Sequence, residues 1–317
     1  AIVSPRGVIA MGIDGVLCRG SDRPAEIADR FHLGSCGKAM TATLLAMLVE
    51  EKTLEWETKV ADVFGDLKEI HPGWQGVTIE QLLTHRGGAP EDLHADGLWT
   101  SLWSHRGTPS EARRRLVEGV LKRAPANKPG TAFLYSNAGY ALAGAAVEKI
   151  TGTAWEELMR KRLFEPLGMA TAGFGAPGRA GLIDSPRGHD RAGKPVEPGP
   201  RADNPPAIAP AGTVHASIGD WAKFVALHLR KDALLKPATF LKLHTAPGNG
   251  RYAMGWGIGN DGELTHAGSN TMWYAVVWIA PKRGFAVMAV TNLAGLGLQA
   301  GTAATDAAAS LLIEQQV

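Results

Sequence analysis

The sequence has few of the patterns that would indicate a disulfide-rich, metal-binding, nucleic-acid-binding or membrane-spanning protein. It contains only two cysteines, Cys18 and Cys36, too few for a disulfide framework or a metal cluster. Its ten histidines show no close ligand spacing such as His-Glu-x-x-His, so we expect no metal. A formal charge of +2 gives no field that would favour nucleic acid. No uninterrupted apolar run is long enough to predict a membrane span.

One short stretch, Gly34-Ser35-Cys36-Gly37-Lys38, places a hydroxyl and an amine at the start of an uncharged segment. Residues 39–49 carry no charge, which predicts a buried helix. Lys38 follows Ser35 by three positions, so the two share a helix face. Burial lowers the pKa of a lysine, and a neutral amine can activate a serine as a nucleophile. From this stretch alone, Lys38 could equally be a snorkelling lysine near a helix end.

The fold class follows from where strand and helix patterns fall. Apolar runs within residues 7–18 flank Asp14-Gly15 and predict a hairpin, and residues 252–259, 272–280 and 285–292 are also strand-like. Helical patterns fill the middle of the chain, and residues 298–316 form an alanine-rich helix. We therefore expect a single α+β domain in which both termini build one antiparallel sheet flanked by helices. The sheet lobe would be about 1–55 plus 208–317, and the inserted helical lobe about 56–207.

Two features of the middle region are expected to have structural roles, and a third predicts a long loop. Asn137 is expected to cap a helix over 138–150, and Arg113-Arg114-Arg115 to form a solvated helix face. Residues 173–212, rich in Gly, Pro, Arg and Asp, predict a long loop that is functional or disordered.

Three tryptophans are candidates for a pocket wall. Trp99 and Trp103 are four positions apart and would share a helix face. Core packing is the default interpretation of this pair, and a substrate-facing aromatic wall is the alternative. Trp273 belongs to a second bulky aromatic stretch, Met272-Trp273-Tyr274, near the end of the chain.

Three stretches taken together resemble the active-site elements of the penicillin-recognising serine hydrolases. They are Ser35-Cys36-Gly37-Lys38, Tyr135-Ser136-Asn137 and His266-Ala267-Gly268. The Tyr-x-Asn form of the second resembles the class C β-lactamase-like branch, which includes DD-peptidases, D-amino-acid amidases, esterases and β-lactamases. The resemblance covers nearly the whole chain and includes Leu82-Leu83-Thr84-His85, Pro129-Gly130-Thr131, Gly139-Tyr140, Pro210-Ala211-Gly212 and Thr291-Asn292.

The resemblance implies a role for each of these residues. Ser35 would be the nucleophile, and Lys38 and Tyr135 would act as a general-base pair, with the Tyr135 phenolate favoured beside a charged Lys38. Asn137 would hydrogen-bond a substrate amide. The backbone N–H groups of Ser35 and of Ser269, which follows Gly268, would form the oxyanion hole. No cofactor is implied.

The main departure from the β-lactamases of this branch is His266, where they usually carry the lysine of Lys-Thr-Gly. A histidine is only partly charged at neutral pH, so weaker selection for carboxylate-bearing β-lactams is expected. We therefore expect a serine hydrolase acting on a small ester or amide, of esterase or D-amino-acid amidase/peptidase type. A class C-type β-lactamase with weak β-lactam hydrolysis and a non-turnover penicillin-binding sensor remain as alternatives. Relatives are often exported, which favours a periplasmic or secreted location over a cytoplasmic one.

Overall fold

The computed structural model describes residues 1–294 and 299–316, and its centre is a six-stranded antiparallel sheet with strand order β2-β1-β9-β8-β7-β6. The strands are β1 (Ile2–Ser4), β2 (Gly7–Ala10), β6 (Gly257–Ile258), β7 (Leu264–Ser269), β8 (Tyr274–Ala280) and β9 (Phe285–Thr291). β1 pairs with β9, with Ile2 opposite Val287, so the two ends of the chain share one sheet. The predicted α+β class is confirmed.

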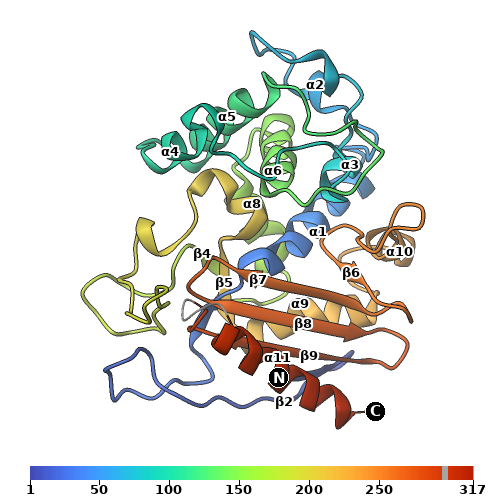
Figure 1. The fold of residues 1–317 in the computed structure, drawn as a ribbon. Coiled ribbons are helices and arrows are strands. Elements are labelled where there is room, and N and C mark those ends of the chain that lie inside the picture. Colours follow the sequence, from blue (N-terminus) through green and yellow to red (C-terminus); the bar gives the residue numbers. More distant parts are fainter. Residues whose placement is uncertain (295–298, 317) are drawn as a thin grey trace.

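A helix covers each face of this sheet (Figure 1). α9 (Ile218–Arg230) packs behind β9 and β1, and α11 (Gln299–Glu314) lies in front of β8 and β9. The Ser217 side chain caps α9 by accepting a hydrogen bond from the Asp220 N–H. The helix predicted over 298–316 is found as α11, and residue 298 lies outside the described residues. Within the described part of the chain, no helix combines the length and apolarity needed to cross a bilayer.

The helical lobe lies on one side of the sheet, and α1 connects the two (Figure 1). The α-helices within residues 56–207 are α2 (Val60–Val63), α3 (Ile79–Leu83), α4 (Leu98–Trp103), α5 (Pro109–Leu121), α6 (Asn137–Thr151) and α7 (Trp155–Met159). The other α-helices apart from α9 and α11 are α1 (Gly37–Glu50), α8 (Ala209–Gly212) and α10 (Pro237–Leu243). A small second sheet joins β3 (Arg30–His32), β5 (Val214–Ser217) and β4 (Gly173–Phe174). α1 is buried along almost its entire length, as expected for a helix apolar on all sides.

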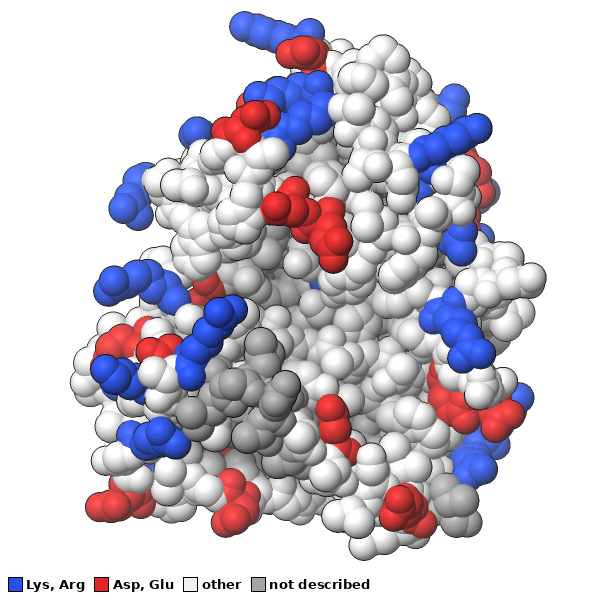
Figure 2. Space-filling view, viewed as in Figure 1, with Lys and Arg blue, Asp and Glu red and all other residues white. Residues whose placement is uncertain are grey.

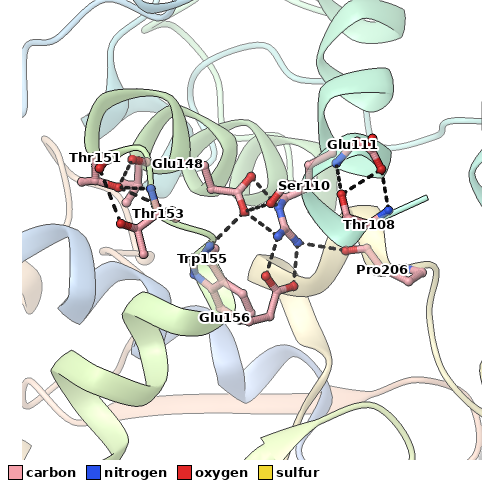
Figure 3. A network of polar contacts seen from close by, with 11 residues as sticks. Thr108, Ser110, Glu111, Glu148, Thr151, Thr153, Trp155, Glu156 and Pro206 are labelled. Carbon is pink, nitrogen blue, oxygen red and sulfur yellow. Dashed lines mark hydrogen bonds and ion pairs between the residues drawn. The ribbon is translucent and has the colours of Figure 1, made fainter.

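A buried ion-pair network ties the helical lobe together (Figure 3). The guanidinium of Arg113 on α5 lies 2.6 Å from carboxylate oxygens of Glu148 on α6 and of Glu156 on α7. It also donates to the Pro206 carbonyl in the long 173–212 segment. The expected solvated face is therefore wrong for Arg113, whose side chain is 0% exposed, because it faces two carboxylates from neighbouring helices.

One predicted hairpin turn is misplaced, and one strand was not predicted. The hairpin joins β1 and β2 through a turn at Pro5-Arg6, whereas Asp14-Gly15 lies in the loop beyond β2. Gly7 has φ +123° at this turn, a backbone conformation that other residues rarely adopt. Strand β7, which carries His266-Ala267-Gly268, has no β-strand pattern in its sequence. It nevertheless pairs along its whole length with β8.

Candidate active site

Ser35 and Lys38 meet where a 3-10 turn at Gly34–Cys36 leads into α1. Lys38 Nζ lies 3.0 Å from Ser35 Oγ, 2.7 Å from Asn137 Oδ1 and 2.8 Å from the Ala211 carbonyl oxygen. Lys38 is 0% exposed, and none of the described carboxylates pairs with it. Burial lowers the pKa of Lys38 to about 7, so a large share of the amine is neutral at neutral pH.

Tyr135 stands on the other side of the Ser35 hydroxyl. Its ring centroid lies 4.8 Å from Lys38 Nζ. Burial raises the pKa of Tyr135 to about 12, and a hydrogen bond with Ser35 opposes the rise only in part. The expectation of a phenolate beside a charged Lys38 is therefore not supported, because burial disfavours both charged forms. A neutral Lys38 amine at this distance can accept the Ser35 proton, and a neutral Tyr135 phenol can pass a proton.

Asn137 reaches the site because Ser136 takes over its expected role as helix cap. The Ser136 hydroxyl accepts from the Gly139 N–H at 3.1 Å and donates to the Pro90 carbonyl at 2.6 Å. The prediction of Asn137 as the N-cap of α6 is thus wrong by one position. Asn137 is the first residue of the helix, and its side-chain oxygen accepts from Lys38, which leaves its NH₂ group as a donor for a ligand.

Two glycines bring the turn at Ser35 against the end of β7. A Cβ atom on Gly268 would lie 2.1 Å from the Leu33 carbonyl oxygen and 2.7 Å from Ser35 N. A Cβ on Gly34, which has φ +49°, would lie 2.3 Å from Ser269 N. Only residues without side chains permit this approach. It brings the N–H groups of Ser35 and Ser269 to the same small region, the arrangement that an oxyanion hole requires.

A histidine–aspartate pair supports this backbone from behind. His32 Nε2 lies 2.6 Å from Asp203 Oδ1, and His32 Nδ1 accepts a hydrogen bond from the Gly34 N–H at 3.1 Å. Asp203 belongs to the long 173–212 segment, so part of that segment holds the turn that carries Ser35.

His266 lies near Tyr135 but is uncharged. Burial, with a smaller contribution from Lys38, lowers the pKa of His266 to about 4. Its Nδ1 lies 2.7 Å from the Ala267 carbonyl oxygen, which can only accept, so Nδ1 carries the proton. Nε2 then accepts from the Tyr252 hydroxyl at 3.0 Å. The expected partial charge on His266 is therefore wrong at neutral pH.

Sequence reasoning assigned no site role to two residues found here, Tyr252 and His85. The His85 ring packs at a tilt against Tyr135 and Tyr252, with ring centroids 4.4 Å and 4.8 Å away, and its Nδ1 accepts from the Ser136 N–H. Burial lowers the pKa of His85 to about 2, so it remains a neutral packing partner. His85 ends a stretch that carries the family resemblance, whereas no motif marks Tyr252, which reaches the site from a separate segment of the chain.

The structure places the three candidate wall tryptophans in two separate parts of the molecule. Trp273 is 1% exposed, stacks on His32 with ring centroids 5.7 Å apart, and accepts a hydrogen bond from Ser269 Oγ through its carbonyl. Trp273 is thus packed in the interior next to the Ser269 turn and is too buried to line an open pocket. Trp99 and Trp103 pack against one another on α4, 6.0 Å apart, in the helical lobe.

Comparisons with known proteins agree with this geometry. The family model described as Beta-lactamase matches residues 3–311. Penicillin-binding protein 4 of Amycolatopsis lactamdurans is 32% identical over 68% of this chain and 55% of its own length. The unguisins hydrolase ungD' of Aspergillus campestris is 28% identical over 86% of this chain and 54% of its own length. The chain spans about half the length of these curated relatives.

A solved structure extends the likeness to the fold. The penicillin-binding protein from Bacillus halodurans superposes with a TM-score of 0.77 at 22% identity, over 96% of this chain and 94% of that one. The match over nearly the whole chain and the assembled Ser35 site lead to one conclusion. The chain belongs to the β-lactamase family of serine hydrolases.

Proposed function

We propose that the chain cleaves an ester or amide bond through an acyl-enzyme on Ser35, as a carboxylesterase or a D-amino-acid amidase/peptidase. One observation carries this proposal: the buried Lys38 amine lies 3.0 Å from Ser35 Oγ, and burial lowers its pKa to about 7. An amine titrating near the working pH is well suited to act as a general base.

In the acylation step, Ser35 Oγ bonds to the substrate carbonyl carbon while Lys38 Nζ takes the hydroxyl proton. The N–H groups of Ser35 and Ser269 hold the developing oxyanion, and each such donor typically contributes about 3–4 kcal/mol. The bond to the leaving group then breaks, and the leaving group takes the proton from Lys38 through Tyr135. In deacylation the oxygen of a water molecule bonds to the acyl carbon while Lys38 takes one of its protons. The bond to Ser35 Oγ then breaks, Ser35 takes that proton back from Lys38, and the acid product leaves.

The neutral His266 favours an ester or amide substrate over a β-lactam. A lysine in its place would offer a permanent cation to a substrate carboxylate next to the oxyanion hole. His266 offers none at neutral pH, since burial lowers its pKa to about 4.

Labelling with a fluorophosphonate and turnover of p-nitrophenyl esters, D-amino-acid amides and a chromogenic cephalosporin test the proposal. We expect labelling and ester or amide turnover by the wild type and by Ser104→Ala, an exposed serine control, and neither by Ser35→Ala. Equal turnover by Ser35→Ala would refute it. Preferred cephalosporin hydrolysis would instead indicate a β-lactamase, and a stoichiometric adduct without product release would indicate a penicillin-binding sensor.

A further inference from the structure

A cavity opens beside the candidate active site, on the side of Tyr252. This cavity has a volume of about 340 Å³ and is lined by Arg86, Phe133, Gly250, Arg251 and Tyr252, which we call the arginine pocket. Tyr252 connects it to the site, because its hydroxyl donates to His266 and its ring centroid lies 6.4 Å from that of Tyr135. A molecule held in the arginine pocket would therefore lie close to Tyr135 and His266, which flank the Ser35 site.

Two arginines from distant segments line this pocket. Arg86 follows His85 in the turn after α3, and Arg251 precedes β6. A Cβ on Gly250 would lie 3.1 Å from Arg86 Nη2, so the Arg86 guanidinium rests against the backbone next to Arg251. An arginine stays protonated in proteins, so both charges persist at any working pH.

Over residues 1–294 and 299–316, no ion pair joins Arg86 or Arg251 to an aspartate or glutamate. The Arg86 guanidinium donates to the Thr131 carbonyl oxygen at 3.4 Å. Figure 2 shows basic side chains on the rim of the hollowed face, on the side of β6. Two unpaired cations at the wall of a concavity concentrate positive potential there.

The rest of the lining is aromatic. Phe133 is 48% exposed, which is unusual for a phenylalanine, and its ring centroid lies 5.6 Å from that of Tyr252. A ligand that suits this lining has a short apolar body that contacts the rings and an anionic end that reaches the guanidinium groups. A carboxylate matches the guanidinium fork through paired hydrogen bonds.

We propose that the arginine pocket binds a carboxylate on the substrate, so that the enzyme prefers esters or amides bearing a negative charge a short apolar chain away from the scissile bond. This inference rests on the proposed function. Two arginines that line a cavity on the Tyr252 side of the site would take the place of the cation that His266 lacks. The preferred substrates would then differ from those of an enzyme with a lysine in the third element, because the carboxylate would be bound beside Tyr252 and not at position 266.

Two matched substrate pairs test the proposal. The p-nitrophenyl monoester of glutaric acid against p-nitrophenyl valerate places the carboxylate on the acyl side. The acetyl ester of 4-hydroxybenzoate against that of p-cresol places it on the leaving group. For at least one pair, we expect the wild type to show a kcat/KM ratio of anionic to neutral ester of about tenfold or more, falling as salt is raised.

Charge-removing variants link that ratio to the pocket. Arg86→Gln and Arg251→Gln should each lower the ratio about fivefold, mainly through KM, and the double variant should bring it to about one. Arg283→Gln, an exposed arginine in the β8–β9 turn, removes the same charge and should leave the ratio unchanged. Thermal unfolding of each variant checks that the fold is retained.

Three results would overturn the proposal: wild type without preference for either anionic ester, a double variant that keeps the wild-type ratio, or an equal loss in Arg283→Gln. Ser35-dependent turnover of the neutral esters in any of these cases would leave the proposed function intact. Absence of that turnover would instead refute the function itself.

Discussion

The rate of Ser35 acylation should follow the deprotonation of Lys38. Burial lowers the pKa of Lys38 to about 7, so about 9% of the amine is neutral at pH 6 and about 91% at pH 8. The second-order rate should therefore rise about tenfold between these pH values and level off above pH 8. A lysine with its ordinary pKa of about 10.4 would give a hundredfold rise over the same range and no plateau.

Fluorophosphonate labelling at limiting reagent is the direct assay, because it reports acylation of Ser35 without a deacylation step. His266 and His85 do not titrate in this range, since burial lowers the pKa of His266 to about 4 and of His85 to about 2. A midpoint near pH 7 that is lost when Lys38 is replaced would therefore belong to Lys38. In Lys38→Arg, whose guanidinium stays charged, labelling should fall to background at every pH.

Two outcomes would refute this reasoning. A tenfold rise for each pH unit through pH 9 would mean that the group accepting the Ser35 proton has a pKa above about 9, so that burial does not bring Lys38 into the neutral range. A midpoint near pH 7 that survives in Lys38→Arg would assign the titration to another group.

Three further predictions concern the framework of the site. Gly268→Ala should lower kcat at least about 100-fold, because its methyl would lie 2.1 Å from the Leu33 carbonyl oxygen. Gly219→Ala, where a methyl meets nothing within 4 Å, should keep wild-type kcat, and equal values for the two would contradict the argument. Arg113→Met should lower the free energy of unfolding by roughly 3–5 kcal/mol in urea, against less than about 1 kcal/mol for the exposed Arg114→Met; similar losses would contradict a buried network. Burial lowers the pKa of His244 to about 3, so the unfolded chain binds the additional proton below pH 6.5 and stability is lost as pH falls. Between pH 6.5 and 4.5 this loss is about 2 kcal/mol, and His244→Phe should show a shallower decline; an unchanged pH slope would contradict it.

Elements with strong local signals were predicted from sequence. α1 carries an uncharged run, α9 has a capping serine followed by residues at helical spacing, and β8 and β9 are rich in β-branched residues. β7 was missed because Thr265-His266-Ala267-Gly268 lacks that pattern. Its strand conformation comes from pairing with β8, a neighbour that local reasoning does not consider.

The burial of Arg113 has a sequence signal, but the run of three arginines hides it. Arg113, Leu116, Val117 and Val120 fall on one helix face, and all four are buried. In the sequence, Arg113 looks equivalent to the arginines beside it, whereas the helical period sets it apart. Its two carboxylate partners on α6 and α7 could be identified only after those helices were placed.

Helix geometry alone determined that Ser35 and Lys38 would meet, because residues three apart on one helix lie close together whatever surrounds them. The charges at the site depend instead on tertiary structure. The neutral amine of Lys38 and the neutral imidazole of His266 both result from burial by segments distant in the chain. The pairing of Arg86 with Arg251 likewise depends on how the turn after α3 packs against the loop before β6. Spacing is a local property of the backbone, whereas desolvation and unpaired charge belong to the folded molecule as a whole.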